Sequence, residues 1–256
     1  MKLEGLIKIA LAIIILPIFA SCRRELCYNH FPTMDIGLSW EHEWERDYGM
    51  HHPDRWDSEY YGIGYDDLRP WKPEWVNMVR YTAEGTSEER FLSSDGGKIM
   101  MSGGKSNSML LYNGDTEYIV LSDIASLYNA RAAATPRSRA SIERVLERHP
   151  DARTTNPPDV LYSAFVAQVP EVKNHELKQM PVKMQPLVYT YVITYEFEHG
   201  IEHVALARGA LGGMAESVYL RTGVTSNESA IILFDCYTKS YGCQTQVRSF
   251  GVPGFP

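Results

Sequence analysis

Short runs of alternating apolar and polar residues, each ended by turn-forming residues, constrain this chain more than any other feature. A period of two places every second side chain on the same face of a strand. In "MDIGLSWEHEW" (34–44) one face collects Ile36, Leu38, Trp40 and Trp44, with acidic residues opposite. Similar runs, bounded by Gly, Asn, Asp or Ser, occupy residues 75–85, 97–104, 108–121, 186–209, 216–223 and 229–242. The pattern predicts a mostly β protein of sandwich architecture.

The boundaries of the units follow from where this pattern is interrupted. "SRASIERVLERHP" (138–150) has helical spacing and ends in a proline, which predicts one short helix. We interpret 131–158 as an excursion within a first sandwich and place the break in "PEVKNHELKQMPVKMQP". The expected domains are therefore 35–171 and 172–256. Asn113-Gly114-Asp115 and His199-Gly200 are expected hairpin corners.

The second block holds fewer strands than a sandwich commonly needs, which is about seven. Its last residues, "RSFGVPGFP", do not read as a closing strand. Either the missing strands come from elsewhere in the chain, or the second domain is incomplete at the C-terminus. An incomplete domain would expose an apolar edge that invites pairing with another chain.

The N-terminus has the layout of a secretory signal. Lys2 and Lys8 give a basic start, and the apolar run at 9–20 is shorter than the roughly 20 residues that cross a bilayer. Phe19-Ala20-Ser21-Cys22 resembles a bacterial lipobox. We therefore expect a lipoprotein signal peptide over 1–21, diacylglycerol and palmitate on Cys22, and a tether over 22–34. The alternative is an ordinary secretion signal that leaves Cys22 unmodified.

Charge and cysteine content limit the partners and the redox state. The net charge of −7 argues against nucleic acid, which needs a basic surface. In an exported chain disulfides persist, and Cys236 and Cys243 flank a short segment that contains a glycine. A bridge between them is expected; the alternative is two free thiols on two strands. Cys27 is given no role.

An aromatic and acidic segment is the main candidate for ligand binding. All five tryptophans lie within residues 40–75. Trp56, Tyr60 and Tyr61 could stack on the faces of sugar rings while nearby carboxylates accept hydrogen bonds from hydroxyl groups. The alternative is core strands with an aromatic surface hairpin.

Metal binding and catalysis are not supported by any motif. The candidate metal ligands are His51, His52, Asp54 and Asp57, and separately His199 and His203, and we interpret both groups as solvated turn residues. "GGKS" (103–106) lacks the glycine that a phosphate-binding loop needs at Ile99. A G-x-S-x-G motif is absent. We expect no enzyme, no metal and no cofactor other than the lipid on Cys22.

Several phrases in order resemble a family. They are "CRRELCYNH", "WDSEYY", "GGKIMMSGGKSNSMLLYNGDTEYIVL", "PPDVLYSAF" and "RGALGGMAESVYLRTG". Together they resemble uncharacterised Bacteroidales lipoproteins among the fimbrillin-like proteins, which are similar to anchoring and minor subunits of fimbriae. The resemblance covers nearly all of residues 22–256.

The resemblance implies two tandem transthyretin-like β-sandwich domains, an outer-membrane lipid anchor, and fimbria assembly or adhesion by strand addition. The implied partners are the membrane and other fimbrial subunits, with a host or glycan ligand as the alternative. Arg46 and Arg55 follow the first strand, but nothing marks either as a site of arginine-specific cleavage. Arg23-Arg24-Glu25 replaces an acidic export signal, so the protein could lie on the cell surface or on the periplasmic face.

Overall fold

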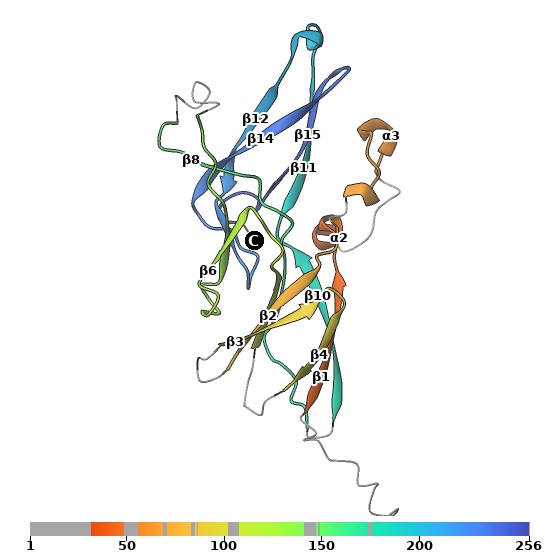
Figure 1. Cartoon of the computed structure of the whole chain (residues 1–256), viewed down its shortest axis with the longest axis vertical. Coiled ribbons are helices and arrows are strands. Elements are labelled where there is room, and N and C mark those ends of the chain that lie inside the picture. The colour runs from red at the N-terminus through yellow and green to blue at the C-terminus, as the bar shows by residue number, and fades with distance from the viewer. Residues whose placement is uncertain are drawn as a thin grey trace, which may run out of the picture.

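The computed structural model describes residues 32–48, 56–68, 71–82, 85, 87–101, 108–140, 147, 149–173 and 176–255; the side chains of Trp44, Tyr60 and Tyr61 lie outside the description. The strands are β1 (Thr33–Trp40), β2 (Trp75–Tyr81), β3 (Ser87–Ser93), β4 (Gly96–Met100), β5 (Ser108–Asn113), β6 (Ile119–Ser122), β7 (Arg131–Ala134), β8 (Arg153–Thr155), β9 (Tyr162–Val166), β10 (Leu177–Pro186), β11 (Tyr189–Glu196), β12 (Ala207–Ala215), β13 (Ser217–Tyr219), β14 (Ser229–Lys239) and β15 (Gly242–Ser249). The helical segments are α2 (Glu43–Tyr48), α3 (Ser58–Tyr61), η3 (Asp66–Leu68) and η5 (Ile201–His203). The expectation of a mostly β chain is confirmed (Figure 1).

The first unit is a sheet that closes on itself in the order β1-β10-β9-β5-β2-β3-β4. β1 runs parallel to β10 and antiparallel to β4. A glycine is required at position 96, where β4 pairs with β1. Its φ is +100°, and a Cβ there would lie 1.8 Å from the carbonyl oxygen of Ile36. The interior is filled by alternate apolar residues, among them Met34, Ile36, Val76, Met78, Met109, Leu111, Tyr162, Met180, Val182 and Met184. β1 is therefore an integral wall of the barrel.

The expected break at 171/172 is wrong, because β10 completes the barrel. Its burial alternates, with Met180, Val182 and Met184 inside and the exposed residues Pro181 and Lys183 between them. Pro181 is tolerated in this strand, since β9 pairs only with Gln185 and Pro186 and leaves one side of β10 open before that point. The division between sheets lies after β10, where β11 begins at Tyr189.

The remaining strands form two further sheets. One has the order β11-β15-β14-β12, with β8 paired parallel to β14, and the other has the order β13-β7-β6. Strands from the first half of the chain thus join strands from the second half: β7 pairs with β13, and β8 with β14. Apolar residues between the three-stranded sheet and the outer face of the barrel form a shared core, including Val79, Leu110, Tyr112, Ala132, Leu161, Val188, Val218, Leu220 and Phe250. The two halves share one folded body rather than forming two independent segments at 35–171 and 172–256.

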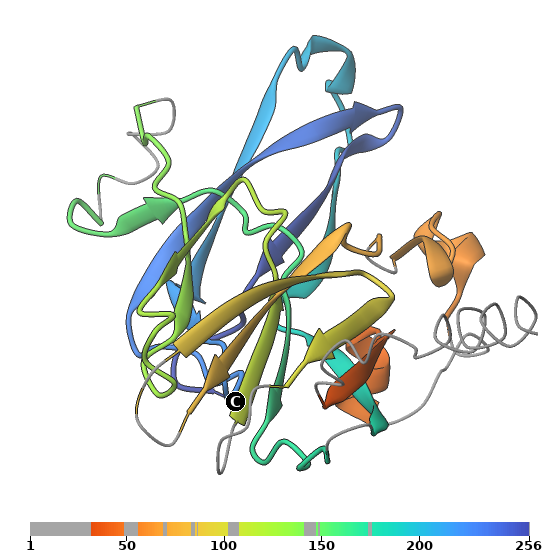
Figure 2. The same ribbon diagram turned by 60° about the horizontal axis from the view of Figure 1, so that its bottom comes forward.

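The sheet of β11, β15, β14 and β12 has a small core of its own. β14 and β15 pair only near their hairpin, between residues 237–239 and 242–244, and then diverge (Figure 2). Only Ile232, Phe234 and Val247 form its fully buried cluster in the described part of the chain. Few buried apolar contacts hold this end of the molecule together.

Both expected hairpin corners are wrong. β5 and β6 lie in different sheets, so the turn after Asn113 is a crossover. The Asn113 amide holds it, donating to the Val160 carbonyl oxygen at 3.0 Å and accepting from the Tyr162 N–H at 2.7 Å. β11 and β12 are not neighbours either, and the segment through Gly200, whose φ is +84°, joins two opposite edges of their sheet.

The expected first strand ends earlier than the alternation suggested. β1 stops at Trp40, and Trp44 belongs to helix α2. The side chain of Glu45 accepts from the backbone N–H of His42 at 2.8 Å, three residues before it, as in a capping box. Arg46 N–H donates to the His42 carbonyl oxygen and closes the first turn. The expected helix at 138–150 lies mostly outside the described residues. Within the described ranges, no helix reaches the length and apolar character needed to cross a membrane.

Candidate functional site

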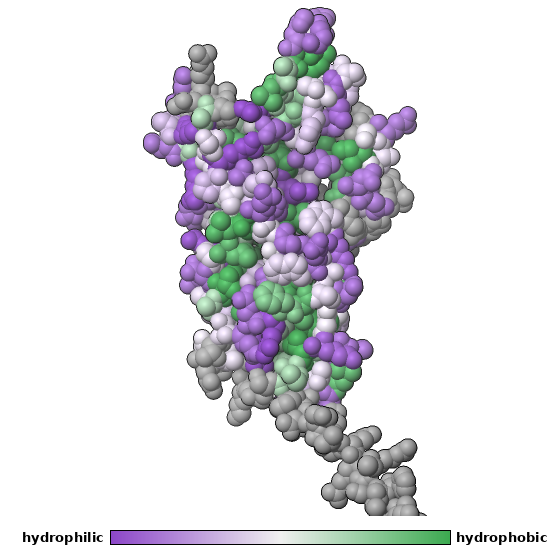
Figure 3. Space-filling view, in the orientation of Figure 1, coloured by the Kyte–Doolittle hydropathy of each residue, from purple (hydrophilic) through white to green (hydrophobic). Residues whose placement is uncertain are grey.

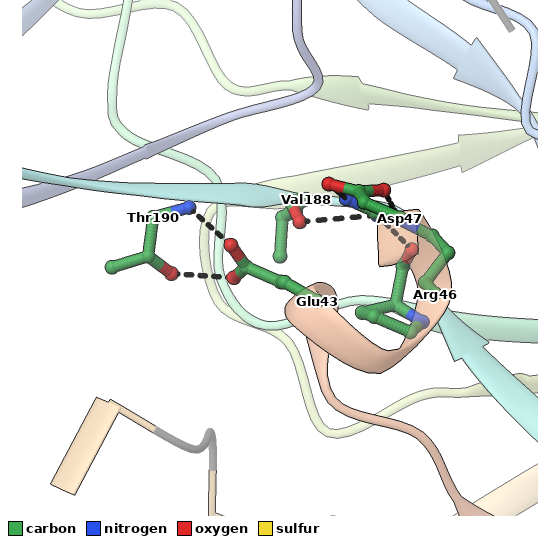
Figure 4. A network of polar contacts seen from close by, with 6 residues as sticks. Glu43, Arg46, Asp47, Val188 and Thr190 are labelled. Atoms are coloured by element: carbon green, nitrogen blue, oxygen red, sulfur yellow. Dashed lines mark hydrogen bonds and ion pairs between the residues drawn. The ribbon is translucent and has the colours of Figure 1, made fainter. Parts of the chain in front are cut away.

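Helix α2 is fastened to the junction between β10 and β11 by a partly buried carboxylate. Glu43 accepts from the backbone N–H of Thr190 at 2.8 Å and from its hydroxyl at 2.6 Å (Figure 4). Burial raises the pKa of Glu43 above its ordinary value, and the two hydrogen bonds from Thr190 oppose that shift. The carboxylate therefore occupies a position that a neighbouring strand would otherwise take.

Arg46 fastens the same junction from the next turn of α2. Its guanidinium carbon lies 4.2 Å from the centre of the Tyr189 ring. Nη1 donates to the Pro186 carbonyl oxygen and, at 3.5 Å, weakly to that of Val188, while Nε donates to Asp47 at 2.7 Å. We call Glu43 and Arg46, with the segment 186–190 that they hold, the α2 clasp. The Arg46 side chain is only 16% exposed, so it has a structural position rather than that of an open cleavage site.

β11 presents an open, regular edge beyond the α2 clasp. It is the last strand of its sheet, paired only with β15 among the described residues. The N–H of Thr190 points to Glu43 and away from β15, so the alternate residues Val192 and Thr194 direct their backbone groups to the same open side. An unpaired row of this kind is a template for another strand.

The opposite edge, β12, is less suited to pairing. Its register shifts between Leu211 and Met214, where Gly213 has a φ of +76°. A bulge of this kind bends the strand and interrupts its ladder of hydrogen bonds, a common way to protect a sheet edge. β11 is therefore the better candidate for strand addition.

Exposed aromatic side chains lie at the end of this sheet. We define the distal patch as Tyr195, Phe197, Leu206, Tyr237 and Tyr241, which are 40–74% exposed. Tyr195 pairs with Cys243 of β15, and Tyr237 pairs with the next residue of β15, Gln244. Consecutive residues of a strand face opposite sides, so Tyr195 and Tyr237 lie on opposite faces of the sheet. Apolar atoms reach the surface just below the polar extreme tip (Figure 3). In Figure 1 this tip lies at the end of the molecule opposite the start of β1.

The sequence-predicted cysteines have different positions. Cys22 lies outside the described residues. Cys236 and Cys243 are free thiols in the structure, and they occupy diagonal rather than directly opposite positions, since Cys243 pairs with Thr238. Diagonal Cα atoms lie about 7–8 Å apart in a regular ladder, whereas a disulfide prefers less than about 7 Å. The bridge stays a prediction.

The predicted glycan and metal residues are not brought together by the described structure. Trp56 donates its indole N–H to the Ile63 carbonyl oxygen at 2.7 Å, so this polar group supports the local fold. Tyr60 and Tyr61 have no described side chains, and His51, His52 and Asp54 lie outside the described residues. Asp57, His199 and His203 are exposed. Among the described residues, no group of three or more metal-binding side chains occurs.

Sequence reasoning missed the α2 clasp. The sequence pattern places Glu43 in the first strand and Arg46 in the loop after it, whereas their partners lie about 140 residues away. The available signal was local: the spacing of His42 and Glu45 fits a helix start. That signal predicts α2, but nothing in the sequence predicts its contact with Thr190.

Comparison with solved structures shows a shared fold. A candidate adhesin from Bacteroides ovatus ATCC 8483 aligns with a TM-score of 0.62 at 20% identity, over 88% of this chain and 68% of that one. The fimbrial anchor protein Mfa2 from Porphyromonas gingivalis aligns with a TM-score of 0.51 at 9% identity, over 86% of this chain and 73% of that one. Comparison with curated protein sequences gave no match.

Family membership follows from the sequence of the folded region. A family model described as a domain of unknown function, DUF5119, matches residues 66–235. The match runs from η3 into β14, through strands of all three sheets, and spans more than half of the chain. This protein is a member of the DUF5119 family.

Proposed function

We propose that the protein is a structural and interaction subunit of the cell envelope, fimbrillin-like and without a catalytic role. It joins other fimbrial subunits by accepting a strand at the edge of β11. The single observation that carries the proposal is this open, regular edge beside the distal patch. The shared fold with a fimbrial anchor protein and a candidate adhesin supports the same role.

Strand addition at β11 has a direct physical basis. An incoming strand would form backbone hydrogen bonds with Val192 and Thr194 on the open side. Its side chains would cover the exposed rings of Tyr195 and Phe197, which are 41% and 40% exposed. Backbone bonds supply affinity that is independent of sequence, and the covered rings supply register.

A photo-crosslinking amino acid at Val192 tests the proposal in the source cells. We expect crosslinks to a segment of another envelope protein, identified by mass spectrometry. Thr194→Pro removes one outward N–H at an edge position and should abolish the crosslinks, whereas Thr194→Val keeps that N–H and should retain them. Equal crosslinking by these two variants would contradict strand addition, as would crosslinks that map only to this chain.

Attachment to the outer membrane through Cys22 is the second part of the proposal. The lipobox-like sequence supports it, because two or more acyl chains together anchor a protein stably. Cys22→Ala should leave the chain unprocessed or move it to the soluble fraction. Palmitate labelling that survives Cys22→Ala would rule out the assignment.

A further inference from the structure

A hollow of about 640 Å³ lies away from the α2 clasp and the distal patch. It is bounded by the ends of β2, β5 and β9 and by the segments that follow β6 and β13. Its lining includes Tyr81, Ser108, Ser126, Tyr128, Phe165 and Arg221. Pockets that bind small molecules commonly measure about 300–1,000 Å³. We call it the Arg221 hollow.

The guanidinium of Arg221 is held in this hollow by two aromatic rings. Its central carbon lies 4.4 Å from the centre of the Tyr128 ring and 4.9 Å from that of Phe165. Such contacts fix the position of a cation without using its N–H donors. Arg221 has no ion pair or hydrogen bond with any described residue, and no carboxylate is among the residues that line the hollow.

Two other arginines of the described chain, Arg80 and Arg137, have carboxylate partners within the protein. Arg80 pairs with Glu88 at 2.8 Å, and Arg137 pairs with Asp235 at 2.7 Å. The protein also carries an excess of acidic residues, with a net charge of −7. A positioned guanidinium with its donors free, in an acidic protein, is therefore available for an anion from outside.

The surroundings of Arg221 indicate what that anion is attached to. Its planar fork matches a carboxylate through two parallel hydrogen bonds. Tyr128 is 71% exposed and offers a flat apolar face beside the charge, and Ser108 and Ser126 offer hydroxyl groups. A carboxylate, an apolar ring face and neighbouring hydroxyl groups occur together in acidic sugars. We propose that the Arg221 hollow binds a carboxylate-bearing sugar, such as a uronic or sialic acid residue of a glycan.

This site is separate from the aromatic segment around Trp56, and it does not depend on strand addition at β11. The carboxylate is bound by Arg221. The sugar ring lies against Tyr128, and its hydroxyl groups exchange hydrogen bonds with Ser108 and Ser126. Loss of the carboxylate removes the strongest contact, so a neutral sugar of the same shape should bind much more weakly.

The test is a titration of the purified full-length chain in detergent, followed by NMR. The probes are methyl β-glucuronide, the methyl glycoside of N-acetylneuraminic acid, and methyl β-glucoside, which differs from the first by the carboxylate alone. Inorganic phosphate and acetate are further arms. At least one acidic sugar should bind. The affinities for the glucoside, phosphate and acetate should each be at least about tenfold lower than the affinity for that sugar.

Variants locate the binding. Arg221→Gln and Arg221→Lys should each lower the affinity for the acidic sugar, and Arg221→Gln should lower it by at least about tenfold. Tyr128→Ala should lower the affinity for the acidic sugar and leave thermal unfolding unchanged, because Tyr128 is exposed. Tyr237→Ala in the distal patch is the matched control and should leave the affinity unchanged. Three results would overturn the proposal: no binding of either acidic sugar, affinity unchanged in a folded Arg221→Gln variant or in Tyr128→Ala, or equal affinity for phosphate, acetate or the glucoside.

Discussion

Replacing Arg46 with alanine tests whether the α2 clasp holds the barrel to the second sheet. The stacked guanidinium over Tyr189 contributes about 0.5–2 kcal/mol. Its charge-assisted hydrogen bond to the Pro186 carbonyl oxygen contributes about 1.5–3 kcal/mol. The pair with Asp47, whose side chain is 38% exposed, adds at most about 1 kcal/mol. Because these contributions overlap, we expect Arg46→Ala to lower the free energy of unfolding by about 2–4 kcal/mol.

Urea unfolding of the purified full-length chain measures this cost. Arg46→Lys keeps the charge but loses the planar fork, so it should fall between the wild type and the alanine variant. Arg90→Ala is the matched control, because the Arg90 side chain is 61% exposed and its ion pair in the described structure is with Glu88 alone. That exposed pair should contribute less than about 1 kcal/mol.

Hydrogen exchange separates a clasp from a general loss of stability. If Arg46 holds the junction, the amide of Thr190 should exchange faster in Arg46→Ala than the global change in stability requires. Amides in the barrel interior, such as that of Met78, should follow the global change. An equal cost for Arg46→Ala and Arg90→Ala, with unchanged exchange at Thr190, would refute the reasoning.

Three further predictions follow from polar groups in the structure. Asn113→Ala should cost about 2–4 kcal/mol in urea unfolding, because it leaves the buried N–H of Tyr162 and a buried carbonyl oxygen without partners; a cost below about 1 kcal/mol would contradict this role. Two arginines lower the pKa of Asp235, so its stabilising effect is present above the ordinary value of 3.8 and is lost as the pH falls through the lower folded-state value. The stability difference between wild type and Asp235→Asn should therefore disappear in acid, and a difference that does not change with pH would argue against the ion pairs. Burial, and then Cys243, raise the pKa of Cys236 to about 11, so a free Cys236 thiol should resist alkylation at pH 7.5 until the chain unfolds; Cys236 and Cys243 that both stay unalkylated in denaturant without reductant would instead establish the predicted bridge.

The local pattern was sufficient to predict many of the strands. In β1 the buried residues Met34 and Ile36 alternate with more exposed neighbours, as a half-buried strand requires. β2 is buried on both faces: Val76 and Met78 fill the barrel, whereas Val79 belongs to the core shared with the three-stranded sheet. β9 lies within the expected first domain, 35–171, and pairs with β5 and β10. β10 carries an equally clear alternation. The expected break in "PEVKNHELKQMPVKMQP" overlaps this strand.

Sheet membership could not be read from the same pattern. Asn113-Gly114-Asp115 has the composition of a tight hairpin turn, yet β5 and β6 separate into different sheets. Turn residues indicate where the chain can reverse, but they do not specify which strands pair. That choice depends on burial of the whole surface, here the core shared by the barrel and the sheet of β13, β7 and β6.

The sequence by itself determined the mostly β class, the alternation that fills the barrel, and the expectation of an exported, lipid-modified chain. Those features depend on neighbouring residues, whose spacing directly sets which side chains share a face. Only the tertiary structure decided the closure of β1 onto β10, the α2 clasp and the Arg221 hollow. Arg46 and the Pro186 carbonyl, or Arg221 and Tyr128, are brought together by folding across long sequence separations, and a linear pattern carries no record of such distances.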